Sequence, residues 1–240
     1  MQPINLDPTE ILDMNFETDK EKLDTIEKEL FSCVIGDVMD GLGHTHQYLP
    51  SEIRPLRDGM TVVGRAKTVL EADCAGHSIH HENREAPFGV MLDALDSMKE
   101  NEVYVCAGAS PNYALWGELM SYAARYRGAV GAVMEGYSRD TKGICEMGFP
   151  TFSFGSYGQD QGVRGRVIDY DCPIRFSNQV KVCPGDIVVG DIDGVVVIPK
   201  SIENEVIAAA LEKVSGENIA RKRIQEGTST RQVWDELGIL

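Results

Sequence analysis

Arg139 and Asp140 stand side by side in a segment, residues 136–140, that follows one predicted strand and precedes a predicted helix. Ligands of open α/β sheets bind outside the carboxyl ends of the strands, which is where this segment would lie. An arginine guanidinium offers a forked pair of donors to a carboxylate or to an enolate oxygen that develops during a reaction. Asp140 is a candidate ligand for a hard cation, because Mg²⁺ commonly takes only one or two protein carboxylates and fills its octahedron with water. The pair therefore predicts chemistry on a small anion.

A second segment of the same kind covers residues 108–120, between a predicted strand and a helix predicted at 114–126. The first-turn amide groups of a helix have no partner within the helix and carry partial positive charge, which suits a carboxylate. Neighbouring βα units would set this segment beside Arg139. The guanidinium and the amides of residues 117–120 could then hold the same ligand.

Each of these residues also has an ordinary structural explanation. An adjacent arginine and aspartate often form a surface ion pair, Asp140 could cap the helix predicted at 141–147, and Glu118 could simply favour a helix start. Neither segment matches a phosphate-binding motif or another motif of high specificity. On spacing alone, both explanations stay open.

The elements that must position these residues alternate between strand and helix over residues 61–154. Strands are indicated by β-branched runs and helices by apolar residues at helical spacing. In chain order they are strand 61–70, helix 87–98, strand 102–106, helix 114–126, strand 129–134, helix 141–147 and strand 151–154. This alternation is typical of a sheet with parallel strands.

After Gly155 the predicted strands become short, are punctuated by turn residues and resemble antiparallel strands. They cover residues 164–170, 173–176, 179–182, 187–190 and 195–198. Asp193-Gly194, between two runs of valine and isoleucine, predicts a hairpin turn because residues that tolerate positive φ are needed there. We therefore interpret Asp191 and Asp193 as turn formers rather than as ligands.

Together the two halves predict an α/β fold class with a layered mixed sheet. We expect residues 1–31 to form an N-terminal arm and helix, residues 32–200 a single α/β catalytic domain, and residues 201–240 a C-terminal helical arm. A long amphipathic helix should begin at Ser201 and stop at Gly227.

Charge and composition restrict the partners of the chain. Asp and Glu outnumber Lys and Arg by 38 to 23, and the net charge of −15 repels nucleic acid and anionic lipid. The same field opposes an anionic substrate, so arginine or a metal must concentrate positive charge at the site. The six cysteines form no CxxC pair, and no apolar run approaches the roughly 20 residues that span a bilayer. We therefore expect a cytoplasmic protein with no nucleic-acid or membrane partner.

Several short motifs occur together in a fixed order between Ile35 and Pro199. They are Trp116-Gly117-Glu118-Leu119-Met120, Gly128, Gly131, Gly136, Arg139-Asp140, Gly148-Phe149-Pro150, Pro184-Gly185-Asp186 and Gly190-Asp191-Ile192-Asp193-Gly194-Val195. This order resembles the family of 4-hydroxy-4-methyl-2-oxoglutarate aldolases and regulator-of-ribonuclease-activity-A proteins, which is often mislabelled as demethylmenaquinone methyltransferases. The co-occurrence is far more specific than any single motif.

The resemblance implies roles for the residues of both segments. In aldolases of this family an acidic residue opens the pyruvate-binding helix and Arg-Asp follows 21 positions later, a spacing that Glu118 and Arg139 show here (139 − 118 = 21). The implied catalytic residues are Arg139, which stabilises the enolate, Glu118 and Asp140, with Asp140 also anchoring Mg²⁺ or Mn²⁺, partly through water. The implied substrate-binding residues are Gly117, Leu119, Met120 and Arg139. A water held near Glu118 or Asp140 is the interpretation for the base.

The resemblance also implies an activity and an assembly. The activity is that of a metal-dependent, class II pyruvate aldolase-type lyase, which cleaves a small anionic 4-hydroxy-2-oxo acid, or oxaloacetate, through a pyruvate-type enolate. The fold would be a layered β/β/α domain like the swivelling phosphohistidine domains, assembled as a homotrimer or homohexamer. The alternative is a non-catalytic regulator that binds and inhibits a ribonuclease, a role that would make no use of Arg139 or Asp140.

One segment departs from the family pattern. Residues 71–84 contain His77, His80 and His81, where typical members have a simpler sequence. His77 and His81 are four residues apart, a spacing that can bind metal on a helix, but the remaining ligands of a zinc hydrolase are missing from the pattern. A polar loop and a substrate-selecting element both remain open for this segment.

Overall fold

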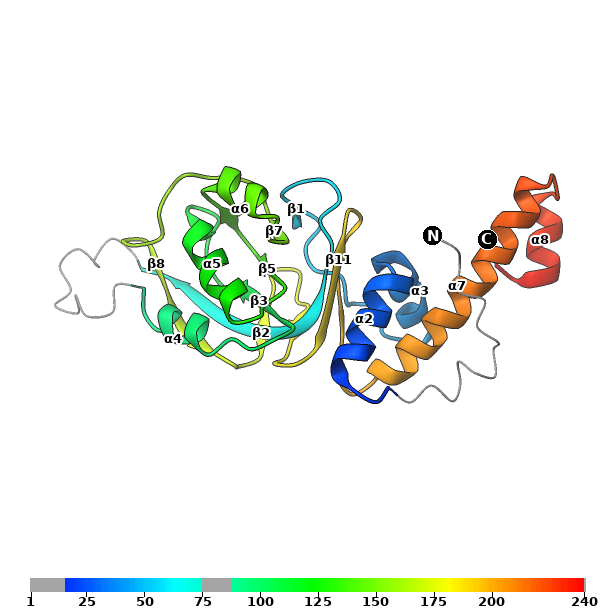
Figure 1. Ribbon diagram of the computed structural model, residues 1–240, viewed down its shortest axis with the longest axis horizontal. Coiled ribbons are helices and arrows are strands. Elements are labelled where there is room, and N and C mark those ends of the chain that lie inside the picture. Colours follow the sequence, from blue (N-terminus) through cyan, green and yellow to red (C-terminus); the bar gives the residue numbers. More distant parts are fainter. Residues whose placement is uncertain (1–15, 75–87, 240) are drawn as a thin grey trace. The chain divides into compact units, whose positions relative to one another are not determined.

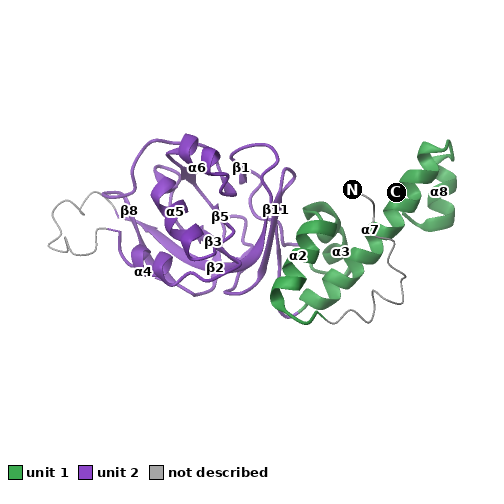
Figure 2. Cartoon of the chain, in the orientation of Figure 1, with its two compact units in different colours: residues 1–45, 202–240 green, residues 46–201 purple. Residues whose placement is uncertain are grey.

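The computed structural model describes residues 16–74 and 88–239, and the chain divides into two compact units (Figure 2). One unit comprises residues 1–45 and 202–240, and the other comprises residues 46–201. The domain boundaries expected at 31/32 and 200/201 stay a prediction. His77, His80 and His81 lie outside the described residues.

The first unit consists of helices from both ends of the chain. They are α2 (Asp19–Glu29), α3 (Ser32–Gly41), α7 (Glu203–Gln225) and α8 (Thr230–Leu237). The long helix α7 packs against α2, α3 and α8, and it buries the apolar stripe that includes Val206 and Ile207. Thr18 and Ser229 cap α2 and α8 by accepting a hydrogen bond from a first-turn amide. Among the helices of the described residues, none combines the length and the apolar character needed to cross a membrane.

A mixed sheet forms the second unit (Figure 1). Its strands are β1 (Arg54–Pro55), β2 (Val62–Asp73), β3 (Glu102–Ala107), β5 (Gly131–Met134), β7 (Thr151–Ser153), β8 (Gly165–Tyr170), β11 (Ile187–Asp191) and β12 (Gly194–Ile198). The order is β1-β7-β5-β3-β2-β11-β12, and β8 pairs with β2 on both sides of a register shift at Leu70/Glu71. Strands β2, β3, β5 and β7 are parallel, and the strands after Gly155 pair antiparallel, which confirms both predictions.

The two faces of this sheet pack on different partners because side chains alternate along each strand. On one face, Tyr104 and Cys106 of β3 lie in a core with helix residues from α4 (Met91–Asp96), α5 (Glu118–Tyr126) and α6 (Thr141–Met147). On the other face, Val103 and Val105 pack on the hairpin of β9 (Ile174–Arg175) and β10 (Lys181–Val182) and on β12. The parallel strands are therefore buried on both sides, as their near-continuous apolar sequences require.

The sheet curls towards closure through the segment that precedes β1. The amide of Leu49 donates to the carbonyl of Val195, and the amide of Val197 donates to the carbonyl of Gln47, so residues 47–49 run along β12. The predicted hairpin joins β11 to β12, with Ile192 and Asp193 in the turn and Gly194 at φ +145°. Because Asp191 Oδ1 accepts from the Asp193 amide at 2.9 Å, the reading of Asp191 as a turn former is confirmed.

Two predicted helices are wrong at their start, since the helix predicted at 87–98 begins only at Met91. The helix predicted at 114–126 begins only at Glu118, and Ala114–Trp116 forms the short strand β4, parallel to β6 (Tyr137–Ser138). The side chains of β4 are buried, and a buried segment of three residues is too short for apolar periodicity to separate a helix from a strand. The strand places the two candidate segments edge to edge.

Candidate active site

A cavity of about 280 Å³ opens at the carboxyl edge of the parallel strands. Its lining includes five of the six residues implied by the family resemblance, namely Gly117, Leu119, Met120, Arg139 and Asp140. The remaining lining is mostly apolar and comes from Phe88, Met91, Leu92, Leu95, Ala114, Leu115, Trp116 and Ala123, with Asp160 and Gln161 as the further polar members. The prediction that the two segments share one site is therefore met by a single concave surface, as small-ligand sites require.

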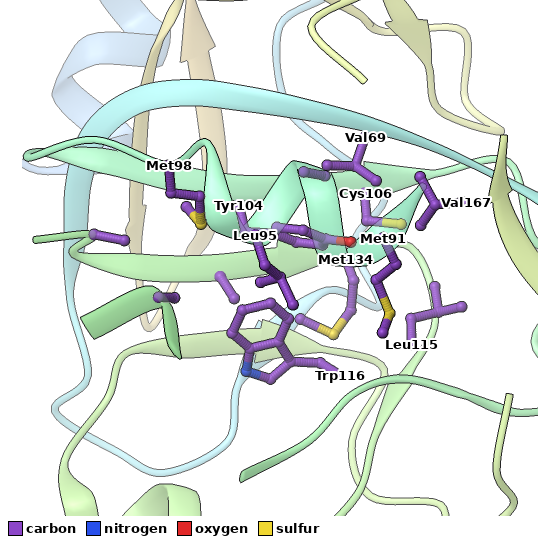
Figure 3. Close-up of a cluster of buried hydrophobic side chains, with 14 of the residues drawn as sticks. Val69, Met91, Leu95, Met98, Tyr104, Cys106, Leu115, Trp116, Met134 and Val167 are labelled. Carbon is purple, nitrogen blue, oxygen red and sulfur yellow. The ribbon is translucent and has the colours of Figure 1, made fainter. Parts of the chain in front are cut away.

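The wall of the cavity is continuous with the hydrophobic core of the sheet. Met91, Leu95, Leu115 and Trp116 line the cavity and also belong to the buried cluster drawn in Figure 3. Trp116 is almost fully buried and stacks on Phe149, with ring centroids 6.1 Å apart. A wall whose side chains are held by close packing is rigid, so the polar groups placed on it keep fixed positions.

The start of α5 is anchored by Trp116. The indole Nε1 donates to Ser121 Oγ at 2.7 Å, and Ser121 Oγ donates to the carbonyl of Gly117 at 3.1 Å. Gly117 is the N-cap and provides no side chain to cap the helix. The first-turn amides, including those of Leu119 and Met120, therefore stay available for an anionic ligand in the cavity.

The turn that carries Arg139 and Asp140 is fixed by the pairing of β6 with β4. The Arg139 amide donates to the Trp116 carbonyl at 2.8 Å. Asp140 adopts the left-handed conformation, with φ 55° and ψ 31°, which is uncommon outside glycine but tolerated best by Asp and Asn. Asp140 is the N-cap residue of α6, as the capping alternative predicts, but its side chain makes no capping hydrogen bond. Its carboxylate instead faces Gly117, where an added Cβ would lie 3.1 Å from Asp140 Oδ2.

Arg139 is held between two carboxylates. Nη1 donates to Asp160 Oδ1 at 2.7 Å, and Nε lies 3.6 Å from Asp140 Oδ2. All three side chains are partly exposed, so part of the guanidinium fork remains open to the cavity. Asp160 was not predicted as a site residue, although its loop follows β7 at the same carboxyl edge of the sheet as the segments of Gly117 and Arg139.

Glu118 occupies a different position from the other predicted residues. Its carboxylate lies over Gly143 of α6, close enough that an added Cβ at Gly143 would meet both carboxylate oxygens within 2.6 Å. The glycine therefore makes room for the acid between the starts of α5 and α6. The catalytic role of Glu118 stays a prediction.

A second polar group lies behind the cavity. Gln161 lines the cavity, and its Nε2 donates to Glu71 Oε1 at 2.6 Å. Glu71 is 2% exposed, and burial together with the charge of Asp73 raises its pKa to about 8. The carboxyl of Glu71 is therefore mostly protonated at pH 7. Glu71 stands at the start of the segment that departs from the family pattern, and no role was predicted for it.

The donor set of the cavity fits a hard divalent cation. Among the described residues, no three His, Cys, Asp or Glu side chains gather into a complete metal cage. Asp140 and Asp160 nevertheless supply carboxylate oxygens in the same cavity, and Mg²⁺ binds through one or two carboxylates with water as the remaining ligands. Asp140 is the better placed candidate, because Asp160 already accepts from Arg139 at 2.7 Å.

Comparison with known proteins identifies relatives over most of the chain. Residues 32–197 match the model of the family described as RraA-like, Aldolase/RraA. The chain is 30% identical over 193 residues to a Halalkalibacterium halodurans protein named "Putative 4-hydroxy-4-methyl-2-oxoglutarate aldolase", with 80% of this chain and 83% of that protein covered. It is 26% identical over 206 residues to Protein DlpA of Legionella pneumophila, with 85% of this chain and 32% of that protein covered. The chain thus spans about a third of the length of DlpA.

A solved structure has the same fold at similar identity. It is described as novel cellulases from microbes associated with the gut ecosystem, and it superimposes with a TM-score of 0.76 at 31% identity. The match covers 86% of this chain and 90% of that chain.

Proposed function

We infer that this chain, which belongs to the RraA-like family described as Aldolase/RraA, is a divalent-metal-dependent lyase. The proposed reaction cleaves a carbon–carbon bond of a small 4-hydroxy-2-oxo acid, or decarboxylates oxaloacetate, and passes through a pyruvate-type enolate. The observation that supports this most is the convergence of Arg139, Asp140 and the free amides of α5 on one cavity. The aldolase name of the Halalkalibacterium halodurans relative agrees with it.

The charge of the site supports a role for a metal. The charged residues among the described lining are Arg139, Asp140 and Asp160, which sum to −1 when all are ionised. A dicarboxylate substrate would be repelled by that charge, and a dication would reverse its sign. When bound, Mg²⁺ or Mn²⁺ would act as a Lewis acid toward the 2-oxo oxygen and the carboxylate.

The protein groups would bind and orient the substrate. The amides of Leu119 and Met120 would donate to the substrate carboxylate at the helix start, and the rigid Trp116 wall would keep that position fixed. Arg139 would donate to the enolate oxygen, where preorganised donors contribute most in a site with little water. Asp140 would hold the cation beside that oxygen. The apolar wall from Leu95 and neighbouring residues would exclude water from the enolate.

A base must remove the proton of the 4-hydroxyl group. We propose that Glu118 or Asp140 holds the water that accepts it, since Asp140 lines the cavity and Glu118 opens α5 beside it, with its carboxylate over Gly143. In oxaloacetate the bond to the departing carboxylate breaks instead, so no hydroxyl proton has to be removed. Both reactions leave the same pyruvate enolate, which explains why one site would serve both.

The competing proposal is a protein-binding regulator that inhibits a ribonuclease. The acidic charge of −15 agrees with a protein-binding role, and the family description includes RraA. A ribonuclease inhibitor would make no use of the contacts of Arg139 with Asp140 and Asp160. The presence of these contacts in the cavity therefore favours the enzyme.

The finer points of fold, assembly and location belong to the same proposal. We propose the layered arrangement of the swivelling phosphohistidine-type β/β/α domains, a homotrimer or homohexamer, and a cytoplasmic location. Light scattering of the purified protein distinguishes the trimer and hexamer from a monomer of 26.4 kDa.

Pyruvate release is the assay that tests the proposed function. Purified protein is incubated with 4-hydroxy-4-methyl-2-oxoglutarate, oxaloacetate and a panel of other 4-hydroxy-2-oxo acids, with Mg²⁺, with Mn²⁺ and with excess chelator. We expect metal-dependent pyruvate from at least one of them. Cello-oligosaccharides are included because one similar structure is described as a cellulase. Sugar release without any pyruvate, or inhibition of a ribonuclease without turnover, would replace the lyase proposal.

Gly117→Ala is expected to damage the site without damaging the fold. The glycine has φ −148°, which alanine adopts without strain, but the new Cβ would lie 3.1 Å from Asp140 Oδ2 and 3.6 Å from Arg139 Cγ. A shift of a few tenths of an ångström in these groups should lower kcat/KM about tenfold or more. Thermal unfolding should change little.

Gly158→Ala is the matched control for this variant. An added Cβ at Gly158 meets nothing within 4 Å, so turnover should match that of the unmodified protein. Normal turnover in Gly117→Ala would show that Asp140 and Arg139 do not take part in the reaction.

A further inference from the structure

Glu71 is a buried acid that the proposed mechanism does not use. It lies in β2 with a register shift beside it, and it is 2% exposed. Among the described residues no lysine, arginine or histidine pairs with it, and Gln161 Nε2 donates to Oε1 at 2.6 Å. A carboxylate left in a dry environment without a cation is costly, so the neutral acid is favoured.

Gln161 connects this acid to the cavity. It is 4% exposed, lines the cavity and directly follows Asp160. The backbone carbonyl of Gln161 accepts from the Arg164 amide at 2.6 Å and from the Gly165 amide at 3.1 Å, so the turn that carries Asp160 closes on β8. Asp160 in turn accepts from Arg139 Nη1 at 2.7 Å. An unbroken series of contacts therefore runs from Glu71 through Gln161 and Asp160 to the guanidinium.

The groups that face Glu71 from the packed elements are acids or weak acids. Asp73 on β2 raises its pKa, and Glu71 itself raises the pKa of Tyr104 and Cys106 on β3 and of Tyr113 before β4, all of which burial already raises. The residue opposite on β8 is Val167. The cations nearest along the two strands are used elsewhere, since Lys67 pairs with Asp171 and Arg166 Nε donates to Cys74.

We propose that Glu71 is a positioning residue of the active site, which as a neutral acid holds Gln161 and thereby keeps Asp160 in place against Arg139. The inference rests on the lyase proposal only for its catalytic consequence. Ionisation would put a negative charge where a single amide donor faces it. The turn would then rearrange to admit water or a further donor, and Arg139 would lose its fixed partner.

The test follows ligand binding against pH in the complete chain. Oxalate, a stable mimic of the pyruvate enolate, is titrated in the presence of Mg²⁺ between pH 6 and 9.5, and kcat/KM is measured over the same range. We expect binding to be nearly constant to about pH 7.5 and then to fall up to tenfold per pH unit, as expected for one proton. Glu71→Gln keeps the shape and the acceptor oxygen and cannot ionise, so it should bind as well at pH 7 and lose the alkaline decline.

Two further variants complete the set. Glu71→Ala removes the acceptor for Gln161 and should weaken binding several-fold at every pH. Glu102→Gln is the matched control. Glu102 is the first residue of β3, whereas Glu71 follows the pairing of Leu70 with Ala107 at the last residue of β3. The Glu102 carboxylate accepts from the Lys99 amide, so the pH profile of the Glu102→Gln variant should be unchanged. An alkaline decline that persists in Glu71→Gln, or normal oxalate binding at pH 7 by a folded Glu71→Ala, would overturn the proposal.

Stability provides a readout that is independent of catalysis. Because the folded state raises the pKa of Glu71 from 4.5 to about 8, its stabilising contribution is complete below pH 4.5 and is lost progressively up to about pH 8. The melting temperature of Glu71→Gln should therefore rise relative to that of the unmodified protein across this window. If oxalate binding and stability behave as expected but no 2-oxo acid is turned over, the positioning role stands and the lyase proposal fails. If turnover is normal and Glu71→Gln keeps the alkaline decline, the lyase proposal stands and the positioning role of Glu71 fails.

Discussion

Arg139→Lys is expected to lose about a hundredfold or more in kcat while the protein folds normally. The guanidinium reaches Asp160 Oδ1 with Nη1 and approaches Asp140 Oδ2 with Nε, and it keeps further N–H groups for the substrate. A lysine ammonium is a single point and cannot serve two carboxylates and an enolate oxygen together. Removal of one preorganised donor to a developing oxyanion typically costs about 10²–10³ in kcat.

Pyruvate release and thermal unfolding, measured on the same preparation, check this prediction. Arg125→Lys is the matched control, because Arg125 lies on α5, outside the cavity lining, donates to the Met147 carbonyl at 2.8 Å and lies over the Phe149 ring. Its turnover should stay within a few-fold of normal. A kcat for Arg139→Lys equal to that of the control would refute the role given to the guanidinium.

Asp140→Ala is expected to abolish the metal-dependent part of the rate. The carboxylate faces Gly117 from a left-handed residue and makes no capping hydrogen bond to α6, and the ion pair observed for it is with Arg139 of the same site. Left-handed residues of this kind concentrate at functional sites, because the surrounding structure must compensate for their cost. Loss of the carboxylate would remove the protein oxygen proposed to hold the cation.

Manganese binding followed by electron paramagnetic resonance, together with turnover at increasing Mg²⁺, checks this second prediction. We expect weaker Mn²⁺ binding by at least tenfold and turnover that no longer responds to added metal. Asp193→Asn, in the β11–β12 turn, is the control for loss of an exposed carboxylate and should bind Mn²⁺ normally. If Asp140→Ala is as active as the unmodified protein and equally indifferent to chelator, Asp140 has no place in the mechanism.

The parts of the fold that follow from local sequence were predicted well. The alternation of strands and helices before Gly155 and the short, turn-punctuated strands after it carry the difference between parallel and antiparallel pairing, because parallel strands need a crossover connection whereas antiparallel strands can be joined by a tight turn. The adjacency of Gly117 and Arg139 followed from the same alternation of strands and helices, since the strands of consecutive βα units end at the same edge of a sheet.

What the sequence could not specify depends on contacts between distant segments. Strand β4 forms only because Ala114–Trp116 pairs with Tyr137–Ser138, and a run of three residues carries no period that predicts this. Asp160 and Gln161 belong to an irregular loop whose path is determined by hydrogen bonds to β8 and to Ala114. Glu71 lies beside the shift of register between β2 and β8, and its burial follows from tertiary contacts that no local pattern in β2 indicates.

The central claim is that the cavity forms a pyruvate enolate, and hydrogen exchange at C3 of pyruvate tests it without knowledge of the natural substrate. Pyruvate is incubated in deuterium oxide with the protein and Mg²⁺, and the loss of the methyl proton signal is followed by nuclear magnetic resonance. We expect exchange well above the rate without protein, and we expect chelator and Arg139→Lys each to abolish it. Exchange no faster than in the protein-free solution, with metal present and the protein folded, would contradict it.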